Sequence, residues 1–364
     1  MRRGRSRSAR LVVLLLGLGA LLWVVGANGA AVARVPAEAR VGVGGPRLPG
    51  TACPAFPSDN VWNTPVTRLP VDRRSTAWLA HMAAGSTFLH PDYGPAGGGA
   101  LPYGIPWQIT PRRPTFVRVH FQYASQSDRG PYPFSARTPI EGGPNATGDR
   151  HALMVDPATC VLYELYDAHY HPDNGSTAGS GAIWNLRSDR LRPAGWTSAD
   201  AAGLPILPGL VNYDEVMSGQ IDHAIRVTAQ TTSTSYLWPA RHQAGSTANP
   251  DYPPMGARFR LKARFRLPPS RCARPCQVVL TAMKTYGLIL ADNGSNWYFG
   301  GTADRRWTDT MVDQLKQIPA DAFQAVDESC LMVTPNSGAA RQPGTPAYDR
   351  ACSKRRASGD HRRG

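Results

Sequence analysis

Glycine and proline constrain this fold more than any other feature, because they divide the chain into short segments. The 364 residues include 36 glycines and 33 prolines, and the apolar stretches between them are typical of short strands joined by turns. Because 42% of the residues are hydrophobic and 18% are charged, the chain can bury a core. We expect a mainly β fold, a β-sandwich or jelly roll with a few peripheral helices, and an α+β fold is the alternative.

Local patterns place the elements. One face of residues 115–123 is apolar and the other is polar, which predicts a half-buried strand. A hairpin is expected from residues 151–156 and 160–166 around a turn at 157–159. Further strands are expected over residues 221–228, 236–238, 257–265 and 287–291. Helices are expected over residues 76–84, 197–202 and 309–317, and residues 277–286 fit either structure.

The N-terminus has the three parts of a secretory signal. Residues 1–10 are rich in arginine, residues 11–26 are uninterrupted apolar residues, and Ala31-Val32-Ala33 fits a cleavage site. An uncleaved signal anchor is the alternative, since the uncharged span is long enough to cross a bilayer. Both interpretations predict a secreted or externally anchored protein, with membrane contact only through an uncleaved segment.

Composition divides the remaining chain into three parts. Residues 34–50 are rich in Ala, Gly, Val and Pro and are predicted to be a linker. Residues 51–333 contain no break in composition, which predicts a single globular domain. Residues 334–364 are polar and basic, and we expect a disordered tail there.

The net charge of +14 comes mainly from the two ends of the chain. Five arginines precede residue 11, and the segment after Val333 carries a net charge of +5. The body between them is close to neutral for its size. A nucleic-acid partner is therefore not predicted.

All six cysteines follow the predicted signal, and their even number indicates an oxidising compartment. Proximity in the sequence favours two short-range pairs and leaves one long-range pair. The predicted disulfides are Cys272–Cys276, Cys330–Cys352 and Cys53–Cys160. A zinc site is disfavoured because no second closely spaced cysteine pair accompanies Cys272 and Cys276.

The sequence lacks the strong catalytic motifs G-x-S-x-G, H-E-x-x-H, the Walker loop and a G-x-G-x-x-G that opens a helix after a strand. ATP-driven, nicotinamide-dependent and ordinary α/β-hydrolase chemistry are therefore disfavoured. No cofactor is predicted, although a divalent metal stays open.

Glu164 is the first catalytic candidate. It lies in the apolar strand 161–166, where Leu162 and Tyr166 share its face. Apolar neighbours raise the pKa of a carboxyl group, which suits a general acid. A solvated face or an ion pair with an arginine is the alternative.

Asp167, His169 and His171 form a second cluster. On an extended strand the two histidines point to one side, as metal ligands do. The Pro-Asp-Asn-Gly turn that follows favours an exposed polar loop, so a metal at His169 and His171 is the alternative. Asp167 is also a candidate base or nucleophile.

His223 and His242 are the candidate general bases. Arg241, beside His242, could hold a substrate carboxylate in a bidentate manner. Asp292 and Asn293 follow an apolar strand, where a simple Asp-Asn-Gly-Ser turn explains them equally well.

Aromatic faces pack against the C–H groups of sugar rings, while polar groups bind hydroxyls. The remaining candidates for substrate binding are chosen on this basis, and core filling is the alternative role of the tryptophans. They are Trp184, Trp238, Trp297, Asn293 and His151.

Three stretches, residues 139–143, 195–206 and 286–295, resemble segments of a secreted bacterial family that is known only as uncharacterised. The resemblance covers most of residues 51–333. It implies a single domain outside the cytoplasm and carries no catalytic residues.

These features predict a secreted carbohydrate-active protein that cleaves a polysaccharide or cell-wall glycan. In hydrolysis, Glu164 would be the acid and Asp292 or Asp167 the base or nucleophile. In β-elimination, Arg241 would neutralise a uronate while a histidine takes the proton. A non-catalytic glycan-binding protein or a structural envelope protein is the alternative, and an enzyme requires one cleft that gathers these side chains.

Overall fold

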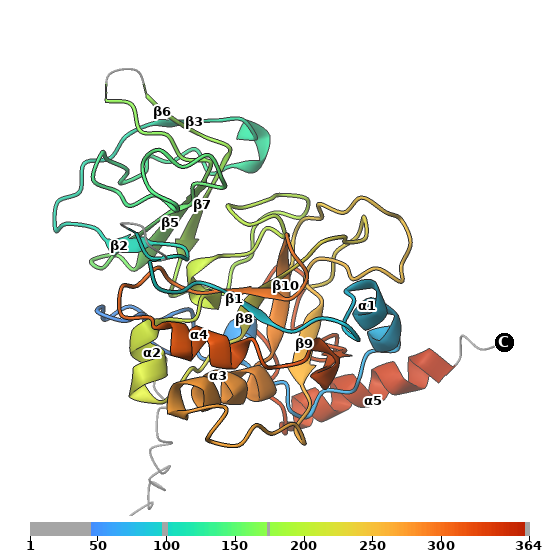
Figure 1. Ribbon diagram of the computed structural model, residues 1–364. Coiled ribbons are helices and arrows are strands. Elements are labelled where there is room, and N and C mark those ends of the chain that lie inside the picture. Colours follow the sequence, from blue (N-terminus) through green and yellow to red (C-terminus); the bar gives the residue numbers. More distant parts are fainter. Residues whose placement is uncertain (1–44, 97–100, 173–174, 361–364) are drawn as a thin grey trace, which may run out of the picture. The chain divides into compact units, whose positions relative to one another are not determined.

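Two β-sheets of unequal size organise the chain in the computed structural model, which describes residues 45–96, 101–172 and 175–360 (Figure 1). The predicted signal and residues 34–44 of the predicted linker lie outside the described residues. Within the described ranges, we find no helix of the length and apolarity that a bilayer crossing needs.

The larger sheet has six strands in the order β1-β11-β8-β10-β9-β12. The pairs β1/β11 and β8/β10 are parallel, and the other neighbours are antiparallel. β8 and β10 lie in the middle and are almost entirely buried, which explains their mostly apolar sequences. The strands are His90–Asp92 (β1), Tyr298–Gly300 (β11), Ile225–Ala229 (β8), Leu288–Asn293 (β10), Arg258–Leu261 (β9) and Phe323–Val326 (β12).

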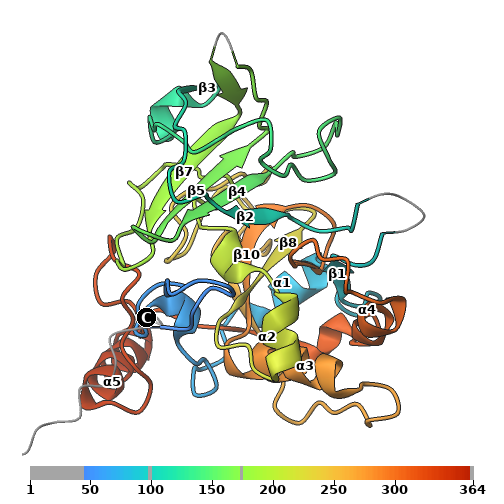
Figure 2. The same cartoon turned by 90° about the vertical axis from the view of Figure 1, so that its left-hand side faces the viewer.

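Short helices pack around this sheet (Figure 2). α1 contacts β12, α3 contacts β9, and α4 contacts both α3 and β1. The helices are Ser75–His81 (α1), Tyr213–Ser218 (α2), Arg274–Thr285 (α3), Asp309–Leu315 (α4) and Pro346–Asp360 (α5). Single 3₁₀ turns are Val61–Asn63 (η1), Ala124–Gln126 (η2), Leu207–Gly209 (η3) and Ala320–Ala322 (η4).

The smaller sheet has the order β2-β4-β5-β7, and a separate pair, β3 and β6, lies beside it. Alternate residues of β4 enter two different cores: Leu153 packs in the main core, whereas Met154 packs in a smaller one. This sheet therefore separates the two cores. The strands are Trp107–Ile109 (β2), Val119–Phe121 (β3), Ala152–Asp156 (β4), Val161–Tyr166 (β5), Ser176–Ala178 (β6) and Ser180–Asn185 (β7).

The prediction of a mainly β, α+β chain with few helices is confirmed. The hairpin is also confirmed, since β4 and β5 pair antiparallel around residues 157–159. The ambiguous segment 277–286 belongs to helix α3 except for its last residue, Tyr286, which caps the helix; α3 begins at Arg274 and has Pro275 in its first turn.

Two predicted elements are absent from the described residues. Residues 197–202 form no helix, because the Ser198 hydroxyl bonds to the backbone of Asp200 and Leu204 and so competes with helical hydrogen bonds. Residues 236–238 form no strand beyond a single bridge between Tyr236 and Met255, and Pro239 cannot extend the ladder.

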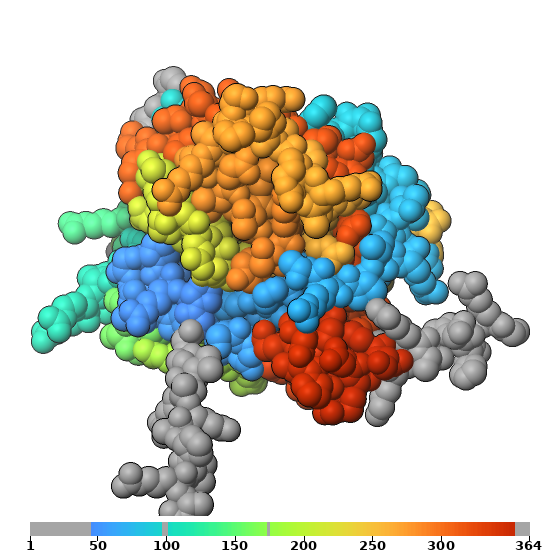
Figure 3. Space-filling model, turned by 90° about the horizontal axis from the view of Figure 1, so that it is seen from below, coloured from blue at the N-terminus to red at the C-terminus, as the bar shows by residue number. Residues whose placement is uncertain are grey.

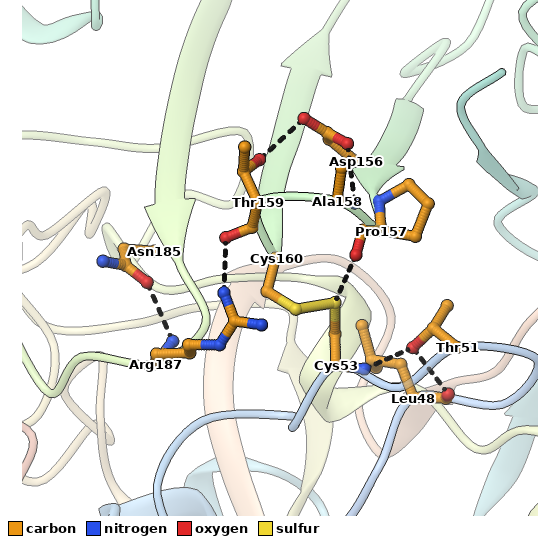
Figure 4. The surroundings of a disulfide bond; sticks show 10 residues. All are labelled: Leu48, Thr51, Cys53, Asp156, Pro157, Ala158, Thr159, Cys160, Asn185 and Arg187. Atoms are coloured by element: carbon orange, nitrogen blue, oxygen red, sulfur yellow. Dashed lines mark hydrogen bonds between the residues drawn. A yellow bond between two sulfur atoms is a disulfide. The ribbon is translucent and has the colours of Figure 1, made fainter. Parts of the chain in front are cut away.

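The three predicted disulfides are confirmed, with Cα–Cα distances of 5.3 Å for Cys53–Cys160, 5.2 Å for Cys272–Cys276 and 5.0 Å for Cys330–Cys352. Cys53–Cys160 ties the N-terminal arm to the turn before β5 (Figure 4). Arg187 braces the same turn by donating from Nη1 to the Thr159 carbonyl at 3.0 Å. The oxidised cysteines fit an extracytoplasmic compartment.

The predicted disordered tail is wrong for the described residues 334–360. The carbonyl of Ser337 accepts a hydrogen bond from Trp238 Nε1 at 2.8 Å. Tyr348 is buried, and Cys352 is bonded to Cys330. Figure 3 shows this C-terminal part, in red, packed beside N-terminal residues, in blue. The polar, basic composition of this segment did not indicate these contacts, because backbone carbonyls are present in every residue and leave no signal in the sequence.

Candidate active site

A cleft of about 360 Å³ lies where the two sheets meet. β10 contributes Asp292 and Asn293 to its wall, while β5 contributes Tyr166 and β7 contributes Ser180. Three loops complete the lining with Tyr123, Gln126, Asp149, residues 197–201, His242 and Ala244.

Asp200 and Asp292 line this cleft, and the guanidinium of Arg226 lies buried behind them. Arg226 on β8 donates to both oxygens of Asp200, from Nε at 2.9 Å and from Nη2 at 2.6 Å. The same Nη2 lies 3.8 Å from Oδ2 of Asp292 on the neighbouring strand. Asp200 has no exposed side-chain surface, whereas 24% of the Asp292 side chain is exposed. Asp292 is therefore the member of the pair that a ligand can reach.

Burial and the negative charge of Asp200 raise the pKa of Asp292 well above its ordinary value, and Arg226 opposes this only in part. Two adjacent carboxyl groups that share one counter-ion do not both ionise readily. Asp292 thus keeps its proton to a higher pH than an ordinary aspartate, as a general acid requires.

A β-bulge determines where Asp292 points. The pairing of β10 with β8 shifts register between Leu290 and Asp292. An extra residue in a strand changes the direction of the side chains that follow it. The irregularity lies directly before Asp292.

His151 is a buried cation beneath the cleft. Its Nδ1 lies 2.6 Å from a carboxylate oxygen of Glu141, and its Nε2 lies 3.1 Å from the Ala199 carbonyl. Because both partners only accept hydrogen bonds, both ring nitrogens carry protons. Burial disfavours this charge, but Glu141 outweighs burial and raises the pKa of His151 to about 9.

His242 offers a basic nitrogen within the same lining. Its Nδ1 lies 2.8 Å from the Ala201 carbonyl, so Nδ1 carries the proton. In the neutral ring, Nε2 then holds the free electron pair.

Asn293 is anchored by two hydrogen bonds of its side chain. It donates to the Ala244 carbonyl at 2.6 Å and accepts from the Thr232 hydroxyl at 2.8 Å.

Glu164 lies outside the cleft, contrary to prediction. Its carboxyl group is fully buried and accepts from the backbone N–H groups of Ile206 and Leu207 and from Trp184 Nε1, at 2.9 to 3.1 Å. Burial raises its pKa to about 7, although these donors oppose the rise. The apolar strand correctly indicated that Glu164 is buried. Its carboxyl group, however, accepts hydrogen bonds from the backbone N–H groups at the start of η3.

His223 and Arg241 are also placed elsewhere. His223 is buried between the Ala224 carbonyl and Glu215. The Arg241 guanidinium donates to the carbonyls of Arg192 and Pro335. These groups stabilise the fold, so neither is available for the predicted β-elimination. Of the side chains that the predicted enzyme required in one cleft, only Asp292 and His242 line it. The predicted catalytic set is therefore wrong, and any enzymatic role has to rest on a different set of residues.

The predicted tryptophans do not line the cleft. Trp297 is fully buried against Phe259 and donates to the Met82 carbonyl, and Trp184 is buried beside Glu164. Trp238 lines a separate cavity. Trp184 and Trp297 fill the core, which was the alternative role considered for the tryptophans.

The cluster at residues 167–171 is a polar loop that does not line the cleft, although Asp167 follows the lining residue Tyr166. His169 Nε2 and Asp167 Oδ1 form a hydrogen bond at 2.9 Å, and both side chains are more than 40% exposed. In the parts of the chain that the structure describes, no three acidic, histidine or cysteine residues are placed to hold a metal ion.

Sequence reasoning missed Asp200, Arg226 and Glu141 as parts of the site. Asp200 was assigned to an expected helix. Arg226 within the apolar strand β8 was the available signal, because a buried guanidinium needs several hydrogen-bond acceptors and a carboxylate is the strongest of these. The three segments that carry the family resemblance each supply one carboxyl group to this network: Glu141, Asp200 and Asp292.

Comparisons with protein-family models, curated proteins and solved structures found no match. The resemblance to an uncharacterised secreted family therefore stays a prediction.

Proposed function

We propose that this protein is a secreted glycoside hydrolase that cleaves a polysaccharide or cell-wall glycan in the cleft between the two sheets. The observation that carries the proposal is the Asp200–Asp292 pair, in which the exposed member has a raised pKa. A proton donor of this kind protonates the leaving oxygen of a glycosidic bond.

Asp292 gives its proton to that oxygen as the bond to the anomeric carbon breaks. A water molecule attacks the same carbon and loses a proton to an exposed base. Asp149 and Nε2 of His242 are the two bases that the cleft offers. The rings of Tyr123 and Tyr166 supply aromatic surface for a sugar, and Gln126, Ser180 and Asn293 supply polar groups.

Hydrolysis is favoured over β-elimination because no arginine or lysine lines the described cleft. Elimination from a uronate requires a group that neutralises its carboxylate. Arg241, the residue predicted for that role, bonds to backbone carbonyls instead.

The test uses the full chain with its disulfides intact and a panel of neutral and uronic polysaccharides. We expect new reducing ends without the absorbance of unsaturated products. Asp292→Asn should lower kcat by at least about 100-fold, since acid catalysis contributes on this scale. Asp313→Asn, an exposed change on α4, is the matched control.

Unsaturated products would contradict hydrolysis and indicate a lyase. Binding on a polysaccharide affinity gel without any cleavage would instead favour the glycan-binding alternative. Separate Asp149→Asn and His242→Gln variants identify the base, because the variant that lacks it loses kcat while keeping substrate binding.

A further inference from the structure

Residues 252–291 contain eight arginines and lysines but no aspartate or glutamate. Arg258 and Arg260 point into the fold, where both donate to backbone carbonyls. The other six lie on the loop from β9 to α3 and on α3 itself, a segment that Figure 3 shows in orange on one face of the molecule. We call these six the basic face: Lys262, Arg264, Arg266, Arg271, Arg274 and Lys284. The four arginines among them are exposed, so the nearly neutral body carries a local excess of positive charge.

The cations of the basic face have no acidic partner among the described residues. None of the ion pairs in the described chain includes one of them. Lys262, for example, donates to the backbone carbonyl of Asp321 at 2.7 Å and not to its carboxylate. Burial lowers the pKa of Lys284, and repulsion by Arg266 adds to this effect. The positive charges therefore repel one another, and a bound anion would relieve this repulsion.

The loop that carries the basic face is anchored at several points. The Cys272–Cys276 disulfide closes its end, and the Gln277 side chain donates to the Leu267 carbonyl at 3.0 Å. The side chains of Phe265 and Leu267 pack against the main core. The exposed arginines therefore extend from a fixed backbone, which lowers the entropy cost of binding a partner.

The chemistry of this surface favours a polymer with repeated negative charges. A guanidinium forms paired hydrogen bonds to a carboxylate or a phosphate. Because the six cations are spread over a loop and a helix, a polymer can contact several of them at once. The large apolar side chains that are exposed in the described chain all lie outside residues 252–291. A membrane partner is therefore disfavoured, since membrane-surface segments also insert apolar groups.

We propose that the basic face binds an anionic polysaccharide, whose repeated carboxylates pair with Arg264, Arg266, Arg271 and Arg274. No residue of the basic face lines the cleft between the two sheets. Attachment at this surface is therefore independent of the proposed hydrolase. It would hold the protein on an acidic glycan, such as a uronate polymer, while the lining of the cleft stays free.

Calorimetry on the full chain with polygalacturonate tests the proposal, and neutral dextran is the control polymer. We expect polygalacturonate to bind with an affinity that falls as the salt concentration rises, because binding releases counterions. Dextran should not bind. Phosphatidylglycerol vesicles, at the same concentration of anionic groups, test the membrane alternative. No binding of polygalacturonate, or equally tight binding of the vesicles, overturns the proposal.

Two variants with the same net charge locate the binding. Replacement of the four exposed arginines of the basic face by glutamine should weaken binding of polygalacturonate at least about tenfold, since several modest charge pairs are lost together. The matched variant replaces four exposed arginines that lie elsewhere and should change the affinity less than about twofold. Its substitutions are Arg112→Gln, Arg113→Gln, Arg129→Gln and Arg137→Gln. Both variants keep the basic residues at the two ends of the chain, so the contribution of these residues cancels.

Equal losses of affinity in the two fourfold variants overturn the assignment to the basic face. Thermal unfolding shows whether each variant is folded. If the variant of the basic face does not fold, the double variants Arg264→Gln/Arg266→Gln and Arg271→Gln/Arg274→Gln provide the test. Unchanged affinity in both double variants then overturns the assignment.

Discussion

At the residue scale, the acid catalysis that we propose for the cleft depends on how charge is divided around the guanidinium of Arg226. Arg226 makes two hydrogen bonds to Asp200 and none to Asp292. Asp292 therefore experiences the repulsion of Asp200 more than the attraction of Arg226. An asymmetric pair of this kind yields one accessible acid, whereas an aspartic-protease pair presents two accessible carboxyl groups.

Two substitutions should move the pH profile in opposite directions. Asp200→Asn removes a negative charge beside Asp292, lowers its pKa and shifts the alkaline limb of kcat/KM down by about one pH unit. His151→Gln removes a positive charge and should shift the same limb up. The pH dependence of hydrolysis measures both, and shifts of the same sign would contradict Asp292 as the acid.

His151 should also make stability depend on pH. Its pKa is about 9 in the fold and about 6.5 when unfolded, so its contribution is full below about pH 6.5 and is lost as pH rises through 9. Urea midpoints at pH 6 and pH 9.5 measure this loss. The loss should be smaller in His151→Gln, and an unchanged loss would show that His151 is not the group responsible.

At the scale of single elements, Glu164 links β5 to the turn at η3. Glu164→Gln replaces an acceptor by a donor opposite three N–H groups. We expect it to reduce the free energy of unfolding by about 1–3 kcal/mol, with kcat unchanged under conditions where the variant is folded. Denaturant unfolding and initial rates check the two parts. A large loss of kcat in a fully folded variant would return Glu164 to a catalytic role.

Sequence patterns predicted elements where local interactions dominate. The hairpin over residues 151–166 was predicted from two apolar segments joined by a short turn. The observed strands β4 and β5 lie within these bounds and pair antiparallel. Long-range contacts explain what was missed. Parallel pairing of β8 with β10 joins strands some 60 residues apart, and the bulge before Asp292 has no periodic signature. The sequence therefore pointed to Asp292 at the end of its strand, but it did not indicate that Asp200 and Arg226 lie beside it.

At the scale of the whole molecule, the long disulfide and a short one should differ in their effects. Cys53–Cys160 spans 107 residues, whereas Cys272–Cys276 spans 4. The chain-entropy model gives a stabilisation of about 5 kcal/mol for the first and about 2 kcal/mol for the second. Thermal unfolding of the paired Cys→Ser variants measures both, and a larger loss from the short disulfide would contradict this model.

The anchoring of Arg241 has a practical consequence for anyone who shortens this chain. Composition alone suggests cutting after residue 333, yet the Pro335 carbonyl and the Asn336 side chain are two of the three groups that accept hydrogen bonds from the Arg241 guanidinium. His242, in the wall of the cleft, is the next residue. Removal of the C-terminus, by design or by a protease, would break these hydrogen bonds of Arg241, which precedes the cleft residue His242. A loss of activity in a shortened protein would therefore not show that the removed residues take part in catalysis.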